Sequence, residues 1–422
     1  MKILIRSAKI ICKNNDLNGQ VKDIFVENGS IQKIEDEIDL DADEIIEGKD
    51  ICVSIGWFDL RVHPKEPGHE YKESFQSMEA AALAGGFSEI ALLPNTKPVI
   101  QTRESVNYLK RAGEKVKFHP MAAVTLKCEG NDFTEMIDLH HAGAIAFTDG
   151  ENPIQNPDIF LKTLQYLSQF GGVLINRPED TNLTHFGQMH DGMMSTFLGM
   201  KGMPQMAEEI MLMRDLKLLE YVLNTPFTDL PVDKSVLHFS GISSAESVNL
   251  IRMGKDIGLP ITCDVYAHQL CFTENDLSEF NTNFKVNPPF RTQEDVDALW
   301  DGLEDGTIDA IASDHNPQDE ESKKLEFDMA EFGVIGLETL FAAINTYNEK
   351  ISLEDLIEKI TVNPRQILQL SIPKIEVGEK ANLTIFSEDE EWVYREKKIT
   401  SASKNSPFIG KTLRGKAIKV IV

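Results

Sequence analysis

The chain has 422 residues, of which 41% are hydrophobic, and its 42 basic and 68 acidic side chains give a formal net charge of −26. This length suits one large domain with a smaller accessory module. The acidic balance argues against a surface that binds nucleic acid or an anionic membrane.

The cysteines indicate a reducing compartment. They are odd in number and have no CxxC spacing: Cys12, Cys52, Cys128, Cys263 and Cys271. This pattern favours neither a disulfide framework nor a thiolate zinc site. No stretch approaches the ~20 apolar residues of a membrane span, and the N-terminus runs into a strand pattern instead of a signal peptide. We therefore expect a cytoplasmic protein with no membrane partner.

Both ends of the chain predict short β-strands. Alternating apolar and polar residues mark strands at 2–12, 21–27, 30–35, 381–386, 391–394 and 410–422. Asn28-Gly29 predicts a tight hairpin turn between the second and third strands. Each end supplies too few strands for a barrel, so we expect the two sets to be halves of one small β-module, with boundaries near Ser54 and Leu370.

The middle of the chain alternates strand and helix, which predicts a parallel sheet with crossover helices. Eight apolar runs are predicted strands, at 53–58, 89–93, 118–123, 145–147, 172–176, 235–239, 261–265 and 310–313. Helical stretches between them include 75–84, 103–111, 204–222 and 245–253. Eight such units favour a TIM-type (β/α)8 barrel, an α/β fold. Long loops at 180–201 and 271–284 are expected over the barrel mouth.

The stretch 56–68, GWFDLRVHPKEPG, ends an apolar run with polar side chains at alternate positions. This period of two places Asp59, Arg61 and His63, followed by Lys65, on one side of an extended segment. A (β/α)8 barrel builds the floor of its active site from strand ends of this kind. The alternative is a solvated strand end that leads into a Pro-Gly turn.

Residues 56–96 resemble the opening of the cyclic amidohydrolases, most closely the class I dihydroorotases. That family begins with Asp-x-His-x-His-x-Arg-Glu-Pro-Gly and continues with Tyr-Lys-Glu, a small-residue helix with Gly-Gly, and Pro-Asn-Thr. The corresponding segments of this chain are 59–68, 71–73, 80–86 and 94–96.

The resemblance implies a domain layout and a chemistry. In this family the two chain ends form one β-sandwich, here residues 1–54 and 371–422, beside a barrel at 55–370. The family hydrolyses a cyclic amide, which requires a metal-bound hydroxide, a polarised carbonyl and a base. Its zinc ligands are a His-x-His pair, a bridging carboxylate, two later His residues and a final Asp.

Four of these ligand positions keep their residue type. His63 matches the second His of the pair, Asp149 in AIAFTDG the bridging carboxylate, His238 in HFS the last His, and Asp314 in SDHNPQ the Asp that is both ligand and catalytic base. One metal position thus keeps His63, Asp149 and Asp314, and the other keeps Asp149 and His238. The alternative is that His63 and His238 are hydrogen-bonded polar residues without a ligand role.

The other two ligand positions are Arg61, at the first His of the pair, and Arg177 in NRPED. An arginine stays protonated, has no lone pair for a metal, and places a charge where the cation should lie. We therefore expect zinc to be absent or limited to one ion. A guanidinium can instead bind a carboxylate through two hydrogen bonds, so we expect Arg61 and Arg177 to pair with Asp149 and Asp314.

The substrate-binding positions of the family are partly retained. The resemblance implies amide contacts to the ligand from Asn95 and Asn287, although both could be turn residues beside proline. Lys65 replaces the family's carboxylate-binding Arg, and Gln318 and Gln269 replace imidazoles. A pocket for a small anionic cyclic amide such as dihydroorotate is expected.

Two functional hypotheses follow. In the first, the chain is a dihydroorotase-like protein of the pyrimidine biosynthesis family that has lost its metals and activity; the resemblance then suggests a structural role with aspartate transcarbamoylase, and a homo-oligomer. In the second, it is an active dihydroorotase, or a hydrolase of another cyclic amide, with one zinc ion at His63, Asp149 and Asp314. Metal content separates them.

Overall fold

The computed structural model describes residues 1–225 and 234–422, and its centre is a barrel of parallel strands. The strands are β6 (Trp57–Val62), β7 (Phe87–Leu92), β8 (Lys117–Pro120), β9 (Leu174–Asn176), β12 (Leu237–Phe239), β13 (Ile261–Tyr266) and β14 (Ala310–Ala312). They form two parallel sheets, β6-β7-β8 and β9-β12-β13-β14. Parallel bridges from Phe147 to Ala122 and Leu174, and from Val62 to His315, join the sheets into a closed ring. The predicted TIM-type barrel is confirmed, and Phe147 occupies the place of the strand predicted at 145–147.

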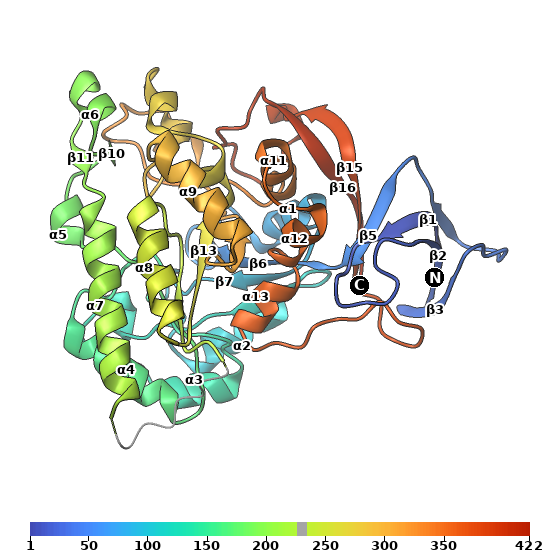
Figure 1. Cartoon of the computed structure of the whole chain (residues 1–422), viewed down its shortest axis with the longest axis horizontal. Coiled ribbons are helices and arrows are strands. Elements are labelled where there is room, and N and C mark those ends of the chain that lie inside the picture. The colour runs from blue at the N-terminus through green and yellow to red at the C-terminus, as the bar shows by residue number, and fades with distance from the viewer. Residues whose placement is uncertain (226–233) are drawn as a thin grey trace.

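Helices cover the outside of this barrel (Figure 1). They are α1 (Phe75–Gly85), α2 (Arg103–Ala112), α3 (Met136–Ala142), α4 (Pro157–Ser168), α7 (Met206–Leu223), α8 (Ala245–Asp256), α9 (Gln293–Glu304), α11 (Leu340–Tyr347), α12 (Leu353–Glu358) and α13 (Val362–Ile367). Several begin where a Ser or Thr side chain accepts a hydrogen bond from the first helical turn, as Ser74 does for α1 and Thr102 for α2. Among the described residues, no helix has both the length and the apolar character needed to cross a membrane.

The long segments predicted as loops carry short elements of their own. Residues 180–201 contain α5 (Thr181–Thr184), β10 (Met189–His190) and α6 (Met193–Leu198), and β10 pairs with β11 (Gly202–Met203). The other segment contains the short helices η3 (Glu274–Leu277) and η4 (Thr282–Phe284). Met189 and Leu277 share one apolar cluster, so the two segments pack together on the barrel.

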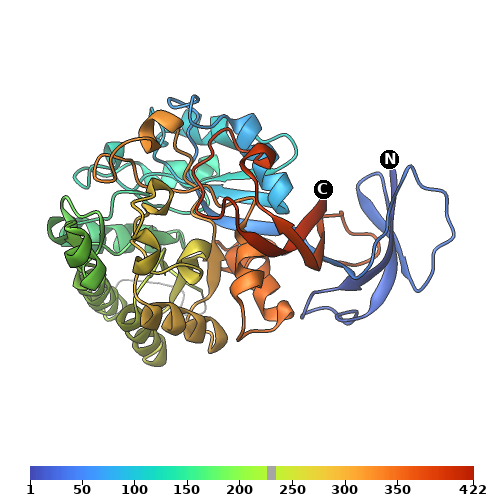
Figure 2. The same cartoon turned by 90° about the horizontal axis from the view of Figure 1, so that it is seen from above.

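The two chain ends meet in one seven-stranded sheet beside the barrel (Figure 2). Its strands are β1 (Lys2–Ile10), β2 (Val21–Glu27), β3 (Ser30–Glu35), β4 (Glu44–Ile46), β5 (Ile51–Ile55), β15 (Leu383–Val393) and β16 (Thr412–Ile421). Asn28 and Gly29 both have positive φ, of 51° and 75°, as the predicted hairpin turn requires. The predicted small β-domain built from both chain ends is confirmed.

The strand predicted at 53–58 is two strands, which corrects the sequence analysis. β5 ends at Ile55 in the accessory sheet, and β6 begins at Trp57 in the barrel. Between them, a Cβ atom on Gly56 would lie 1.9 Å from the Asn382 side chain and 2.2 Å from the Ser88 hydroxyl. The chain passes from one sheet to the other at a point where only glycine fits.

Glu89 joins the barrel to the accessory sheet. Its carboxylate accepts hydrogen bonds from His119 Nε2 at 2.6 Å, Arg365 Nη2 at 2.9 Å and Asn382 Nδ2 at 3.0 Å. Burial raises the pKa of Glu89, but the His119 hydrogen bond and the Arg365 charge outweigh it and hold the pKa well below its ordinary value. This cluster stabilises the fold most strongly when Glu89 is ionised.

Replacing Glu89 with Gln is expected to lower the free energy of unfolding by about 1–3 kcal/mol at neutral pH, because Arg365 loses its charged partner. The folded-state pKa of Glu89 lies below the ordinary value of 4.5. Its contribution to the free energy of unfolding is therefore complete above pH 4.5 and is lost as the pH falls below 4.5. Urea unfolding should therefore show the parent and Glu89→Gln converging as the medium is acidified. The exposed Glu114→Gln is the control, and a constant difference across the pH range would contradict the assignment.

Candidate functional site

A cavity of about 530 Å³ opens at the carboxyl ends of the barrel strands. The following predicted site residues line it: Arg61, His63, Lys65, Asn95, Arg177, Asn287, Asp314 and Gln318. Asp149 and His238 are buried but are not among the lining residues. Strand ends around the barrel thus bring together residues more than 250 positions apart, as expected for this fold.

Arg61, His63 and Asp314 form one buried network. Arg61 Nε donates to Asp314 Oδ1 at 2.9 Å, and His63 Nε2 lies 2.8 Å from the same oxygen. The other ring nitrogen of His63, Nδ1, lies 2.8 Å from Glu151 Oε1. Carboxylate oxygens are acceptors, so both contacts are satisfied when each ring nitrogen of His63 carries a proton. The predicted pairing of Arg61 with Asp314 is confirmed.

Two carboxylates in this network are held ionised. Burial raises the pKa of Asp314, but the charge and hydrogen bond of His63 and the charge of Arg61 bring it below its ordinary value. The pKa of Glu151 is also held well below its ordinary value: partial burial raises it, but the His63 hydrogen bond and the charges of His63, Lys65 and Arg61 outweigh that effect. The sequence analysis did not single out Glu151, although a carboxylate directly after the AIAFTDG motif could have identified it.

Arg177 has a different partner from the one predicted. Its Nη1 lies 2.5 Å from Glu179 Oε2, and its Nη2 donates to the Glu151 carbonyl at 2.9 Å. Glu179 also accepts hydrogen bonds from Thr184 at 2.5 Å and Asn287 at 3.1 Å. The prediction that Arg177 pairs with Asp149 or Asp314 is wrong, because Glu179 leaves the same strand end two residues later and offers a closer carboxylate.

Among the described residues, Asp149 forms no ion pair with an arginine. Its Oδ1 accepts from the Thr125 backbone N–H at 2.9 Å and its Oδ2 from the Thr125 hydroxyl at 2.5 Å. Burial raises the pKa of Asp149 to about 6, and the Thr125 hydrogen bonds offset only part of that effect. The expected neutralisation of Asp149 by Arg61 or Arg177 is therefore wrong, since the carboxylate is held by the loop after β8.

His238 uses both ring nitrogens inside the barrel wall. Nε2 lies 2.9 Å from Asp264 Oδ2, and Nδ1 lies 2.9 Å from the Thr262 hydroxyl. Asp264 also accepts from the Gly241 backbone N–H at 2.6 Å. His238 is only 1% exposed. This geometry matches the alternative in which His238 is a hydrogen-bonded polar residue.

These side chains do not fit a pair of divalent cations. Arg61 occupies the cavity beside Asp314, and the ring nitrogens of His63 and His238 are bonded within the protein. Within residues 1–225 and 234–422, no group of three or more His, Cys, Asp or Glu side chains is arranged to hold a metal ion. A metal would have to displace charge-assisted hydrogen bonds and overcome the repulsion of a buried guanidinium.

The amides of the predicted ligand-binding set bind the protein itself. Asn95 Nδ2 donates to the Asp149 carbonyl at 3.0 Å, and Asn95 Oδ1 accepts from the Glu151 N–H at 3.1 Å. Asn287 donates to Glu179. Both asparagines thus shape the cavity wall, which agrees with the alternative that they are turn residues beside proline. Gln269 lies outside the cavity lining, where its amide donates to the Pro288 carbonyl at 2.6 Å.

Two lysines give the cavity a surplus of positive charge. Lys65 Nζ donates to the amide oxygen of Asn316 at 2.6 Å, and Lys72 Nζ to that of Gln318 at 2.6 Å. The carboxylate closest to the Lys72 ammonium is 3.9 Å away, on Asp319. Burial lowers the pKa of Lys65, and the nearby charge of Glu151 opposes that effect. Neutral partners leave both ammonium groups able to bind an anion.

Comparison with known proteins agrees with this architecture. A family model described as dihydro-orotase-like matches residues 51–222, and an amidohydrolase family model matches residues 191–422. Dihydroorotase from Syntrophus aciditrophicus is 38% identical over 429 residues, which cover 100% of this chain and 98% of the relative. Dihydroorotase from Ruminiclostridium cellulolyticum is 38% identical over 428 residues, which cover 100% of this chain and 97% of the relative.

Solved structures share the fold at lower identity. An L-hydantoinase from Arthrobacter aurescens superposes with a TM-score of 0.85 at 23% identity, covering 100% of this chain and 94% of that chain. A dihydropyrimidinase from Brevibacillus agri has a TM-score of 0.82 at 16% identity, and the match covers 100% of this chain and 93% of that chain.

Proposed function

Since the chain belongs to the dihydroorotase family of amidohydrolases, we propose that it is a member without the dinuclear metal centre and without turnover, which keeps an anion-binding cavity at the barrel mouth. The observation that carries this proposal is the buried network of Arg61, His63 and Asp314. In this network, the side chains at three metal-ligand positions of the family form hydrogen bonds with one another.

The same network makes Asp314 a poor general base. A base that accepts a proton at neutral pH works best when its pKa lies near the working pH. The charges of His63 and Arg61 bring the pKa of Asp314 below its ordinary value, despite burial. Its Oδ1 is already shared by two donors. This supports the absence of amide hydrolysis by the metal-free protein.

The metal content of the purified protein is expected to be well under one zinc per chain after incubation with zinc and desalting, because neither metal position has its full set of ligands. Elemental analysis measures this directly. Two firmly held zinc ions per chain, or hydrolysis of dihydroorotate at roughly 1 s⁻¹ or faster, would refute the proposal. Either result would favour the alternative of an active cyclic amidohydrolase.

The cavity is proposed to bind a small anionic cyclic amide, with dihydroorotate as the reference ligand. Lys65→Met is expected to weaken its binding by about 10-fold or more, because one of the two ammonium groups with neutral partners is removed. Calorimetric titration provides the affinities. Lys97→Met is the matched control, since Lys97 is exposed and does not line the cavity. Equal affinity in the parent and Lys65→Met would show that the anion lies elsewhere.

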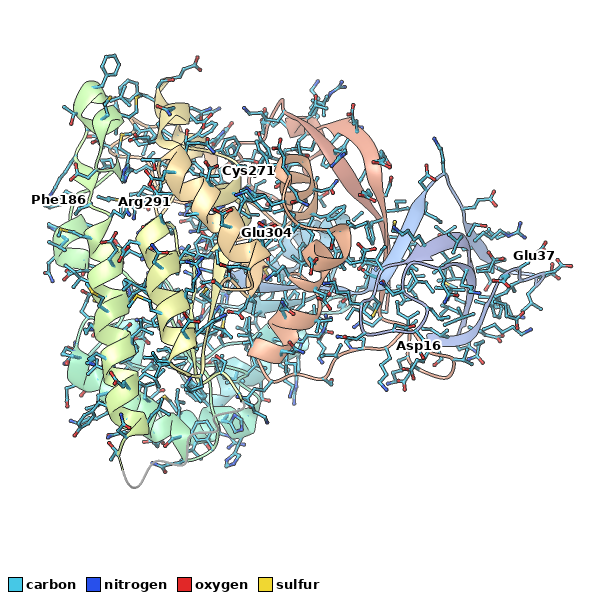
Figure 3. All side chains as sticks on the ribbon, in the orientation of Figure 1. Asp16, Glu37, Phe186, Cys271, Arg291 and Glu304 are labelled. Carbon is cyan, nitrogen blue, oxygen red and sulfur yellow. The ribbon has the colours of Figure 1, made fainter. Side chains whose placement is uncertain are left out.

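A protein of this family without turnover requires another role, and we propose assembly with aspartate transcarbamoylase. The segment 180–201 supports a contact surface, because Phe186, Met193 and Phe197 are 72%, 83% and 80% exposed. Figure 3 shows Phe186 at the outer edge of the barrel. Co-migration with the transcarbamoylase of the same organism in analytical ultracentrifugation, reduced in Phe186→Ser/Phe197→Ser, is expected; separate sedimentation at micromolar concentrations would contradict this role.

A further inference from the structure

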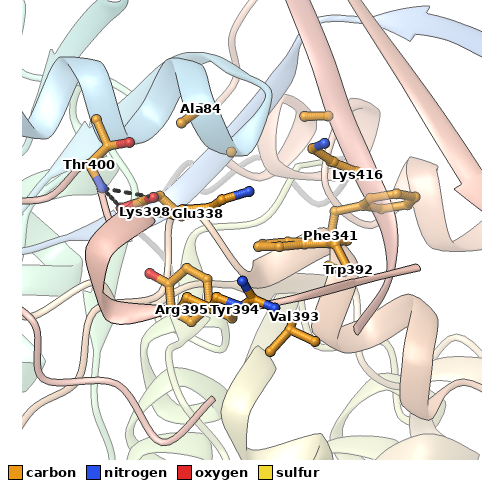
Figure 4. A pocket seen from close by; sticks show the side chains of 13 residues that line it. Ala84, Glu338, Phe341, Trp392, Val393, Tyr394, Arg395, Lys398, Thr400 and Lys416 are labelled. Carbon is orange, nitrogen blue, oxygen red and sulfur yellow. Dashed lines mark hydrogen bonds between the residues drawn. The ribbon is translucent and has the colours of Figure 1, made fainter. Parts of the chain in front are cut away.

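A second cavity, of about 380 Å³, lies between the barrel and the C-terminal hairpin of β15 and β16 (Figure 4). Its walls are the end of α1, the side of α11 that carries Phe341, the end of β15 and the adjoining part of β16. It shares no lining residue with the mouth cavity. The proposed function makes no use of it.

Aromatic side chains and cations line this second cavity. Trp392 and Phe341 provide apolar ring surface, and the indole N–H of Trp392 donates to the Gly415 carbonyl at 2.9 Å, which fixes the ring. Arg395 and Lys398 are exposed lining residues, and neither takes part in an ion pair within 4.0 Å in the part of the chain that the structure describes. In a chain of net charge −26, two lining cations that form no ion pair, against the single lining carboxylate of Glu338, indicate a site that attracts an anion.

Tyr394 adds a buried donor without an acceptor. It lines the cavity, is 1% exposed, and its hydroxyl has no hydrogen-bond partner among the described residues. Burial raises the pKa of Tyr394, and the charge of Glu338 raises it further, so the hydroxyl keeps its proton. Figure 4 shows Tyr394 beside Arg395, with Glu338 and Thr400 on the adjoining wall. A buried hydroxyl of this kind normally has a partner, which a ligand would supply.

We propose that this second cavity binds a small anion with a planar base, of the nucleoside monophosphate class. The base stacks on Trp392, where an offset aromatic contact is favourable. The phosphate binds Arg395 and Lys398, since guanidinium and ammonium groups form charge-assisted hydrogen bonds with phosphate. The Tyr394 hydroxyl donates to a carbonyl on the base. The cavity volume is within the range of ligand sites and favours a base with a single ring.

The segment 400–405 connects this cavity to the one at the barrel mouth. At its start, the Thr400 backbone N–H donates to both Glu338 oxygens at 2.9 and 3.0 Å. The Ser401 hydroxyl and the Ala402 backbone N–H then donate to Glu73, which neighbours Lys72. One end of the segment is therefore a wall of the second cavity.

The other end of the segment holds lining residues of the mouth cavity. The Ser403 hydroxyl donates to the Lys72 carbonyl at 2.7 Å. Asn405 donates to the Asn316 carbonyl at 3.0 Å and accepts from the Gln318 N–H at 3.1 Å. A ligand that contacts residues 394–400 is therefore coupled to the backbone that positions Lys72, Asn316 and Gln318.

Uridine 5′-monophosphate is the probe for this site, and calorimetric titration of the full-length protein measures its affinity. Arg395→Ala/Lys398→Ala is expected to weaken binding by 10-fold or more. Lys397→Ala, on the same turn but outside the cavity lining, should bind as the parent does. Tyr394→Phe should also weaken binding, and uridine and ribose 5-phosphate should each bind more weakly than the intact probe. Melting curves check that the variants fold.

Three results would overturn the proposal. The first is the absence of saturable binding up to about 5 mM probe, and the second is equal affinity in the parent and Arg395→Ala/Lys398→Ala. The third is loss of binding in Lys65→Met, which would place the nucleotide in the mouth cavity. Hydrogen exchange tests the coupling: the probe should slow exchange at residues 401–405, and unchanged exchange at saturation would refute the coupling. None of these outcomes depends on metal content or dihydroorotate hydrolysis, which test the proposed function.

Discussion

Replacing Arg61 with methionine is expected to lower the free energy of unfolding by about 3–5 kcal/mol, because the buried Asp314 carboxylate loses its guanidinium partner and keeps only His63. Arg61 is 3% and Asp314 4% exposed, and their hydrogen bond is 2.9 Å long. Arg61 also lies over the Tyr266 ring, 5.5 Å from its centroid, so the substitution removes a second favourable contact. Urea unfolding in buffer with a chelator measures the loss.

A double-mutant cycle identifies the partner. Adding Asp314→Asn to Arg61→Met should recover part of the stability, because the buried charge that lost its guanidinium partner is removed as well. Arg252→Met is the matched control: Arg252 pairs with Asp305 at 2.7 Å, but the two side chains are 36% and 43% exposed, so a loss of about 1 kcal/mol or less is expected. An Arg61→Met curve that overlays the parent would refute a buried ion pair at this position.

Arg177 should be coupled to a different acid. The contact of Arg177 with Glu179 predicts that Glu179→Gln recovers stability in an Arg177→Met background and that Asp149→Asn does not.

Changing both arginines to histidine, Arg61→His/Arg177→His, is expected to raise the zinc content from well under one to at least one ion per chain. The change removes two fixed positive charges, each of which would repel a divalent ion by several kcal/mol at an effective dielectric of ~20. It also adds ring nitrogens with lone pairs at both positions. Turnover should not return with the metal, since Lys65 and Gln318 still differ from the family's substrate-binding residues. Elemental analysis and a dihydroorotate assay separate the two effects.

The control for this variant keeps the charge. Arg61→Lys/Arg177→Lys retains two protonated side chains without metal-binding lone pairs, so its zinc content should stay at the parent level. If the histidine variant held no more zinc than the lysine variant, the arginines would not be the reason for weak metal binding, and the position of Asp149 against Thr125 would become the explanation to test.

The local pattern of the sequence predicted most of the fold. Apolar residues at a period of two at both chain ends predicted the strands of the accessory sheet, and Asn28-Gly29 predicted a turn that needs positive φ. Strand and helix periods in alternation predicted the barrel. The boundary at Gly56 was missed, because β5 and β6 form one continuous apolar run, and only the close approach of Asn382 and Ser88 separates them.

What the sequence alone determined about the site is the chemistry of its side chains. Arginine cannot ligate a metal in any fold, so Arg61 and Arg177, at positions that the family resemblance assigns to metal ligands, predicted a changed centre before any geometry was known. Which carboxylate each arginine binds was decided by the tertiary structure. Several acidic side chains converge on the barrel mouth, and electrostatic attraction selects the one that the backbone brings within hydrogen-bonding distance. Closure of the barrel brings Asp314 next to Arg61, although the two are 253 positions apart in the sequence, whereas Arg177 binds Glu179, which is only two residues away.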